Sequence, residues 1–273
     1  MSFKKLFGNK KLPIIGMIHV GALPGTPYYG KSFEAVVHKA CQDAHIYKKH
    51  NIDGVIVENM HDIPYVKSNH YEPEIIASMT RLCSEIKQIL PKTTSCGIQI
   101  LAGKNIEALA VAKIANLQFI RCEGFVFGHV ADEGYIDACA GPLLRYRSKI
   151  DAQNILIFAD IKKKHSSHAI TNDVNIIETA KAADFFKADG VIITGKGTGD
   201  PANDNELQQL KENLKIPVLI GSGIDYENLH KFQTADALIV GSTFKKDGKW
   251  ENDICEERLT HFLEKVYAIR EKI

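Results

Sequence analysis

The chain has 273 residues, of which 45% are hydrophobic and 25% charged, values that are ordinary for a globular protein with a large core. Its formal net charge is +1, with 34 basic and 33 acidic residues, so no global field attracts nucleic acid or an anionic membrane. No apolar run of about 18 residues occurs, and we expect no membrane insertion.

The first residues of the chain are more basic than the rest. Residues 1–12 carry several lysines without the apolar stretch of a secretory signal, and we expect a short N-terminal extension there. The six cysteines form neither a C-x-x-C motif nor a zinc-knuckle spacing. This cysteine usage favours a reducing compartment, and we predict a cytoplasmic location.

From residue 14 onward, short β-branched apolar runs alternate with longer amphipathic stretches. The runs start on average roughly 32 residues apart, which is about the length of one strand–helix unit of a barrel. Continuous rather than alternating apolar runs are typical of parallel strands buried on both faces. The eight predicted strands are Ile14–His19, Gly54–Glu58, Ser95–Leu101, Gln118–Cys122, Ile155–Asp160, Gly190–Thr194, Val218–Ile220 and Ala237–Val240.

Three of the intervening stretches show clear helical periodicity. They are Ser32–His50, Glu74–Leu90 and Asn252–Glu271, the last of which would be the closing helix. An open, doubly wound sheet also alternates strands and helices, but eight units favour closure. We therefore predict a closed (β/α)₈ TIM barrel of eight parallel strands, with the whole chain, 1–273, as one domain.

The last two predicted strands end in glycine and a hydroxyl residue. Glycine allows backbone N–H groups to approach an oxyanion closely, and phosphate sites commonly form after barrel strands seven and eight. We therefore predict a small phosphorylated ligand. Its phosphate would lie against Gly195, Gly221, Ser222, Gly223, Gly241 and Ser242.

Charged and polar side chains follow the other strands, where the chemistry of a barrel gathers. The predicted catalytic residues, for acid–base or metal-assisted chemistry, are Glu58, Glu123, Asp160 and Lys162. Further ligand-binding candidates are His19, Gln99, Arg121, Lys164 and His165. The alternative interpretation is a layer of salt bridges across the barrel mouth.

The segment Phe158–His165 is the densest of these clusters. If the strand continues past Asp160, alternation places Asp160, Lys162 and Lys164 on one face, where an aspartate and a lysine form an acid–base pair. A Schiff-base lysine would need desolvation. A solvated basic loop is the alternative, above all for Lys163, and solvent exposure is the favoured interpretation of His165 and His168.

A divalent metal ion is a further possibility. Glu58, Glu123, Asp160 and His165 would hold Mg²⁺ or Mn²⁺ if they converge over the barrel axis, and more histidine would suit Zn²⁺. No compact metal-binding motif supports such a site. The sequence therefore leaves metal ligands and cofactors unassigned.

Taken together, several motifs resemble those of the BtpA family. They are Ile14–His19, Leu23–Gly25, Gly54–Asn59 with Asp62 and Pro64, Met79–Arg81, Phe158–Asp160 with Lys164–His165, Val191–Gly195, Thr198–Gly199, Val218–Gly223 and Ile239–Gly241 with Phe244–Lys245. The resemblance runs from about residue 13 to residue 250 and implies a barrel of the ribulose-phosphate-binding type. A cyanobacterial member is associated with photosystem I biogenesis, and a bacterial relative lies among sugar-metabolism genes. The family supplies no reaction, and Gln99 stands where its members more often have asparagine.

Two functions remain as hypotheses. One is an enzyme acting on a small phosphorylated metabolite such as a sugar or nucleotide-like phosphate. The other is a non-catalytic binding or assembly factor that keeps the phosphate pocket. Nucleic-acid binding is disfavoured by the charge balance, and an oligomer is possible by analogy with other barrels.

Overall fold

The computed structural model of the protein describes residues 2–195, 197 and 200–272. Thr198 and Gly199, which belong to the family motifs, lie outside the described residues. Eight parallel strands form a closed barrel in the order β1-β2-β3-β4-β7-β9-β10-β11, with β11 pairing again with β1. The predicted TIM barrel is confirmed. The barrel strands are β1 (Ile14–His19), β2 (Gly54–Glu58), β3 (Ser95–Gln99), β4 (Phe119–Cys122), β7 (Leu156–Asp160), β9 (Gly190–Ile193), β10 (Val218–Ile220) and β11 (Ala237–Val240).

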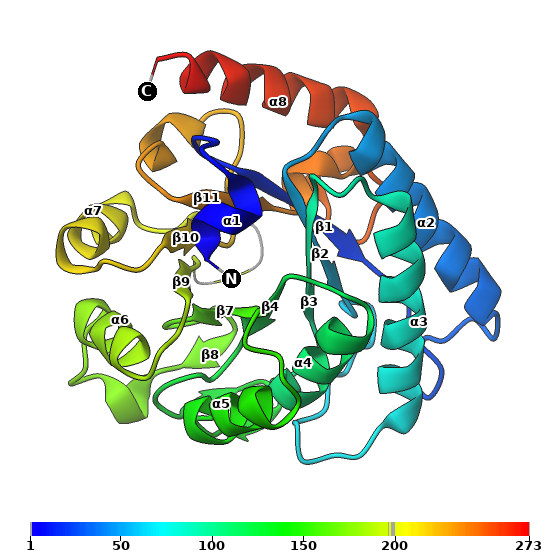
Figure 1. The fold of residues 1–273 in the computed structure, drawn as a ribbon, viewed down its shortest axis with the longest axis horizontal. Coiled ribbons are helices and arrows are strands. Elements are labelled where there is room, and N and C mark those ends of the chain that lie inside the picture. Colours follow the sequence, from blue (N-terminus) through cyan, green and yellow to red (C-terminus); the bar gives the residue numbers. More distant parts are fainter. Residues whose placement is uncertain (1, 196, 198–199, 273) are drawn as a thin grey trace.

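Helices form a ring around these strands (Figure 1). The connection after β10 is shorter than the others and carries the 3₁₀ turn Leu229–Phe232. The helices are α1 (Phe3–Phe7), α2 (Phe33–Lys49), α3 (Pro73–Ile89), α4 (Asn105–Ile114), α5 (Ala140–Lys149), α6 (Ile176–Phe185), α7 (Asp204–Asn213) and α8 (Glu256–Arg270). No helix among the described residues is long and apolar enough to cross a bilayer.

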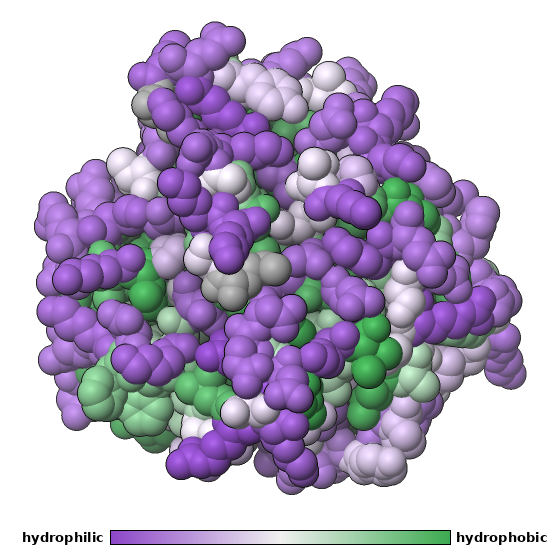
Figure 2. Space-filling view, viewed as in Figure 1, coloured by the Kyte–Doolittle hydropathy of each residue, from purple (hydrophilic) through white to green (hydrophobic). Residues whose placement is uncertain are grey.

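The N-terminal extension closes one end of the barrel. Helix α1 lies across the opening at the amino ends of the strands (Figure 1). The Phe3 ring lies 6.1 Å from the ring of Phe158 inside the barrel, and Ser95 Oγ donates to the Leu6 carbonyl at 2.9 Å. Leu6 and Phe7 join an apolar cluster inside the barrel, so this end is sealed. The surface of the same face is mostly hydrophilic (Figure 2).

The opposite, carboxyl end carries a small second sheet that the sequence did not predict. Strands β5 (His129–Ala131) and β6 (Gly134–Ile136) form a hairpin in the loop after β4. Strand β8 (Ser166–Ser167), in the loop after β7, pairs with β5. Two loops that the barrel places side by side are thereby joined into one wall over the mouth.

Candidate functional site

A cavity of about 590 Å³ opens at the carboxyl ends of the barrel strands. All predicted site residues except Lys162 and Gly195 line it. Residues from distant parts of the chain meet here because parallel closure brings every strand's carboxyl end to the same face. Below the cavity, the apolar cluster around Met17, Ile56 and Phe158 fills the barrel and supports its floor.

A row of polar side chains forms part of that floor. Strand register places His19 beside Glu58, and Glu58 beside Gln99, on three neighbouring strands. All three line the cavity, and burial leaves Glu58 and Gln99 with 6% and 2% exposure. Residues paired at one height of a barrel point the same way, so these three groups face one volume.

His19 and Glu58 lie close together, and neither side chain carries a permanent positive charge. His19 Nε2 lies 3.5 Å from Glu58 Oε2, and His19 Nδ1 lies 3.3 Å from the Trp250 carbonyl oxygen. Burial, and then the charge of Lys245, lower the pKa of His19 to about 3, so the ring is neutral. Nδ1 must then carry the proton, because its partner is an acceptor. Burial also raises the pKa of Glu58, although the charges of Arg121 and Lys164 act against this shift.

Two buried ion pairs stand next to this row. Arg121 Nε donates to both oxygens of Asp160, at 3.2 and 2.9 Å, and Lys163 Nζ lies 3.0 Å from Glu123 Oε1. Burial opposes ionisation of Glu123, but Lys163 outweighs it and lowers the pKa of this carboxyl. The predicted salt-bridge layer therefore exists, and it is one part of the cavity wall.

Lys164 also lines the cavity, and its backbone N–H donates to Thr194 Oγ1 at 3.1 Å. Burial, and then the neighbouring charge of Arg121, lower the pKa of the Lys164 amine. The desolvation that a reactive lysine requires is therefore present at this position. His165, expected to be solvated, also lines the cavity.

The prediction that Lys162 shares a face with Asp160 is wrong. Strand β7 ends at Asp160, and Lys162 has φ 47°, so strand alternation stops before this residue. The Lys162 amine donates to the Thr171 carbonyl at 2.8 Å, away from the cavity. The sequence left open whether Lys163 lies in a solvated loop. This residue is instead 9% exposed and lines the cavity.

The glycines after β10 and β11 have different roles. Gly223 has φ 67°, and a Cβ there would lie 2.1 Å from the Asp200 backbone, so packing alone requires glycine. Beside Gly241, a Cβ would meet Met17 and His19 at 3.4 and 3.5 Å, nearly ordinary contacts. Intramolecular packing therefore leaves room for a side chain at Gly241, which is consistent with close approach of a ligand.

Three of the predicted phosphate contacts, Gly195, Gly221 and Ser222, are used in hydrogen bonds within the chain. The Gly195 N–H donates to Ser222 Oγ at 2.8 Å, and Ser222 Oγ donates to the Asp200 carbonyl at 3.1 Å. The Gly221 N–H bonds the Ile193 carbonyl. These groups hold the loop after β9 against β10. Gly195 does not line the cavity. Ser222 does line it, but its hydroxyl is already hydrogen-bonded within the chain.

Sequence reasoning missed a cation on this side of the cavity. Arg258, in the first turns of α8, lines the cavity and donates from Nε to the Thr243 carbonyl at 2.8 Å. Its guanidinium lies 5.5 Å from the centre of the Tyr226 ring. Nothing near Arg258 in the sequence marks it, because the contact depends on how the segment between β11 and α8 folds back on itself.

The rim of the cavity is held by the loops after β1, β2 and β3. Asp62 accepts the Leu23 N–H at Oδ1 and the Asn59 side-chain amide at Oδ2, both at 2.8 Å, while Asn59 Oδ1 accepts the Leu101 N–H. Burial raises the pKa of Asp62 to about 6. Asn59 and Asp62 thus position loops and do not face a ligand.

The carboxylates do not form a metal centre in the part of the chain that the structure describes. No group of three or more His, Cys, Asp or Glu side chains has a metal-holding arrangement there. Asp160 and Glu123 are already paired with the cations Arg121 and Lys163. The described residues thus offer no set of ligands for the divalent cation that the sequence leaves possible.

Two acceptors on the cavity wall lack donors. Gln99 Oε1 and Glu133 Oε2, the latter from the turn of the β5–β6 hairpin, are buried and find no hydrogen-bond donor among the described residues. Both residues line the cavity. The hairpin has a sequence signal, because Asp132-Glu133-Gly134 separates two short β-prone runs.

Comparison with known proteins agrees with this architecture. A phosphoribosyl anthranilate isomerase from Thermus thermophilus aligns with 94% of this chain and 100% of its own, with TM-score 0.59 and 13% identity. An orotidine 5′-monophosphate decarboxylase from Methanocaldococcus jannaschii aligns over 94% and 100%, with TM-score 0.53 and 13% identity. At these identities the likeness shows the fold alone, a (β/α)₈ barrel.

Sequence comparison narrows this class to one family. The pattern that defines the BtpA family matches residues 10–268, and the chain belongs to that family. An uncharacterised Caenorhabditis elegans protein, whose name includes the word mitochondrial, is 49% identical over 97% of both chains. The photosystem I biogenesis protein BtpA of Synechocystis is 32% identical, covering 92% of this chain and 87% of its own. The name of the nematode relative refers to mitochondria, whereas the sequence predicts a cytoplasmic location for this chain. That location stays a prediction.

Proposed function

We propose that the protein is an enzyme that binds a small phosphorylated metabolite in the cavity and moves a proton on it. The observation that carries this proposal is the division of one 590 Å³ cavity into two unlike walls. One wall consists of glycine turns with Arg258, and the other of buried ionisable groups around Glu58. Such a pocket suits a ligand that is anionic at one end and reactive at the other.

The phosphate end lies at the turns after β10 and β11. The 3₁₀ turn Ser242–Phe244 begins directly after Gly241, and its first N–H groups lack partners within the turn, as at any helix start. Backbone N–H groups and an arginine are the donors that phosphate prefers. Because Gly195, Gly221 and the Ser222 hydroxyl are bonded within the chain, the proposed phosphate contacts are Gly223, Gly241, Ser242 and Arg258.

The reactive end lies around Glu58. A carboxyl whose pKa is raised by burial holds a proton more tightly than an ordinary carboxylate does, and Glu58 lies next to a neutral imidazole, so it suits proton transfer to and from a ligand. Arg121 and Lys164 place positive charge beside it, where it stabilises an oxyanion that forms on a substrate. Glu123 and Asp160 hold the two cations Lys163 and Arg121 in position.

The test is ligand binding with matched compounds. Calorimetric titration with sugar phosphates and nucleoside monophosphates should give binding that their dephosphorylated counterparts lack. Arg258→Leu should weaken the binding about 10-fold, because a hydrogen bond to a charged group contributes roughly 1.5 kcal/mol or more. The matched control is Arg145→Leu on α5, an exposed arginine that bonds the Gly141 carbonyl of its own helix. Equal binding by phosphorylated and dephosphorylated compounds would contradict the proposal.

The name of the Synechocystis relative favours one alternative, a non-catalytic biogenesis factor that keeps the phosphate pocket. The two functions differ in whether the protein converts the compound that it binds. If a bound compound is converted, as followed by nuclear magnetic resonance, and Glu58→Gln abolishes conversion while preserving binding, the enzyme is supported. If the wild-type protein binds the compound and leaves it unchanged, the binding factor is supported instead.

A further inference from the structure

We propose that the ligand is a polyhydroxylated phosphate, such as a sugar or sugar-alcohol phosphate, and that Gln99 recognises one of its hydroxyl groups. This inference rests on the proposed function and specifies the chemistry of the ligand's other end. It starts from the two acceptors on the cavity wall that lack donors, Gln99 Oε1 and Glu133 Oε2.

The amide of Gln99 is costly where it stands. The residue is 2% exposed on an inner barrel strand, and its oxygen lacks a donor among the described residues. A buried polar group without a hydrogen bond destabilises a fold, and a methionine would fill a similar volume without that cost. An amide at this position is explained if a ligand completes its hydrogen bonds.

The chemistry of the acceptors defines the group that they bind. Carboxylate and amide oxygens only accept, so the ligand must bring donors. Glu58 adds further acceptor oxygens to the cavity lining. A phosphate dianion offers no donors, whereas each hydroxyl of a polyol offers one. A hydroxyl also accepts, so it satisfies the Gln99 amide in either orientation.

Register places this hydroxyl next to the reacting position. Gln99 pairs with Glu58 on the neighbouring strand, so a hydroxyl bound by Gln99 lies beside the atom that Glu58 protonates or deprotonates. Glu133, from the hairpin that joins the loops after β4 and β7, contacts the ligand from the cavity wall. A carbon chain with neighbouring oxygen functions fits both contacts.

The experiment compares ligands that share a phosphate and differ in hydroxyls. D-ribose 5-phosphate, D-glucose 6-phosphate and glycerol 3-phosphate are titrated against n-propyl phosphate, which has no hydroxyl on its chain. In the wild-type protein, the best polyol phosphate should bind about 10-fold or more tightly than n-propyl phosphate. Gln99→Met should lower this ratio clearly below the wild-type value, because one of the acceptors for the polyol hydroxyls is lost.

The matched control is Gln209→Met on the exposed face of α7, which should keep the wild-type ratio. Thermal melting checks that each variant is folded, and Gln99→Asn, which keeps a shortened amide, is a second variant with an intermediate ratio. A folded Gln99→Met protein with the wild-type ratio overturns the inference, as does equal wild-type binding of n-propyl and polyol phosphates. Both results leave the proposed function standing, whereas a panel in which nothing binds contradicts that function and the inference together.

Discussion

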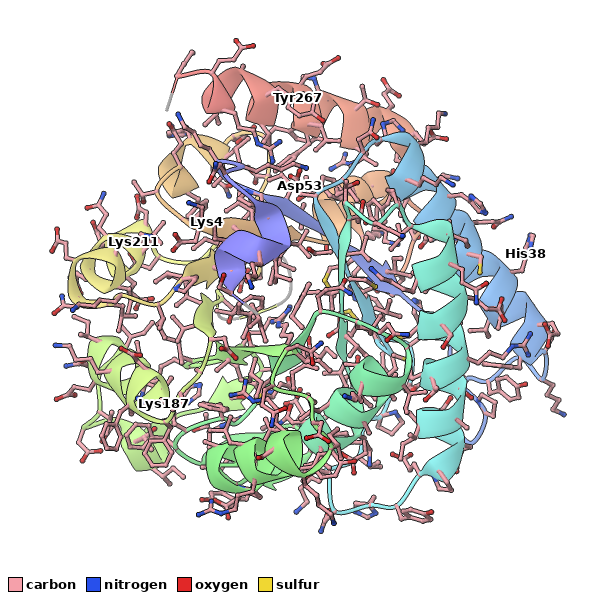
Figure 3. All side chains as sticks on the ribbon, viewed as in Figure 1. Lys4, His38, Asp53, Lys187, Lys211 and Tyr267 are labelled. Atoms are coloured by element: carbon pink, nitrogen blue, oxygen red, sulfur yellow. The ribbon has the colours of Figure 1, made fainter. Side chains whose placement is uncertain are left out.

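Both ends of the barrel bury polar side chains, but the buried acceptor oxygens at the two ends differ in whether they have hydrogen-bond donors. At the amino end, Asp53 is 4% exposed and accepts hydrogen bonds from Lys10 at 2.7 Å, from the Ile14 N–H at 2.8 Å and from Arg270. Asp53 lies within the ring of helices, whereas His38 lies at its outer edge (Figure 3). At the carboxyl end, Gln99 and Glu133 keep acceptor oxygens without donors.

This difference separates groups that stabilise the fold from groups that serve a ligand. Asp53 joins the N-terminal extension, the start of β1 and the end of α8, so its bonds are complete within the chain. If the proposed function is right, the cavity residues lower the stability of the fold but bind a ligand, a common property of functional sites. Substitutions at the two ends should therefore change different measured quantities.

The largest effect is expected at the amino end. Asp53→Ala removes the shared partner of Lys10, Arg270 and the Ile14 N–H, and should lower the free energy of unfolding by about 3 kcal/mol. Ligand affinity should not change, because Asp53 is far from the carboxyl end of β2. Urea denaturation and calorimetric titration measure the two quantities. Glu212→Ala, an exposed carboxylate on α7, is the control and should change neither. A loss of affinity in a folded Asp53→Ala protein would break the comparison.

The strands could be predicted because a buried parallel strand carries its signal locally. Each of the eight predicted runs overlaps its observed strand; four match it at both ends, and the other four differ at one end by one or two residues. The polar row of His19, Glu58 and Gln99 could also be predicted, since each residue ends or nearly ends an apolar run.

The rest of the site depends on backbone turns and closure that no local pattern encodes. The left-handed conformation at Lys162 directs Lys163 inward and Lys162 outward, which reverses the roles expected from strand alternation. Arg258 reaches the cavity because the segment between β11 and α8 folds back and brings it to the Thr243 carbonyl. The internal bonds of Gly195 and Ser222 arise from the fold of the loop after β9, which the sequence left open.

A second, smaller effect is expected from pH. Burial lowers the pKa of His19 to about 3 from the ordinary 6.5, so between these values the unfolded chain binds a proton that the folded chain does not. Stability contributed by neutral His19 is present above pH 6.5 and is lost as pH falls toward 3. At pH 4.5 this loss is roughly 2 kcal/mol relative to neutral pH.

His19→Asn keeps a donor for the Trp250 carbonyl and removes the titration, so its free energy of unfolding should fall less between pH 7 and pH 4.5, by about 2 kcal/mol. Denaturation at a series of pH values measures this difference. His38→Asn, at an exposed position (Figure 3), is the matched control. An unchanged pH dependence in His19→Asn would mean that His19 is not held neutral on the cavity floor.

The smallest change in stability is expected from a substitution at Glu58. It should stabilise the fold, whereas Asp53→Ala should destabilise it. Because burial raises the pKa of Glu58 above the ordinary 4.5, the folded chain holds this proton more tightly than the unfolded chain does. The folded state therefore loses stability as pH rises from 4.5 through the raised pKa, and the penalty is fully present above it. Glu58→Gln removes the charge, so the variant should melt at a slightly higher temperature than the wild type at pH 7. Below pH 4.5 the difference should disappear.

The same variant should bind the phosphorylated ligand and fail to convert it, because an amide cannot exchange the proton. Thermal melting at pH 4 and pH 7 with a turnover assay tests both halves, and Glu212→Gln on α7 is the isosteric control. If Glu58→Gln instead destabilises the protein at pH 7 as Asp53→Ala does, Glu58 has the structural role of Asp53. The two ends of the barrel would then bury charge for the same reason, and Glu58 would lose its place at the reactive end of the cavity.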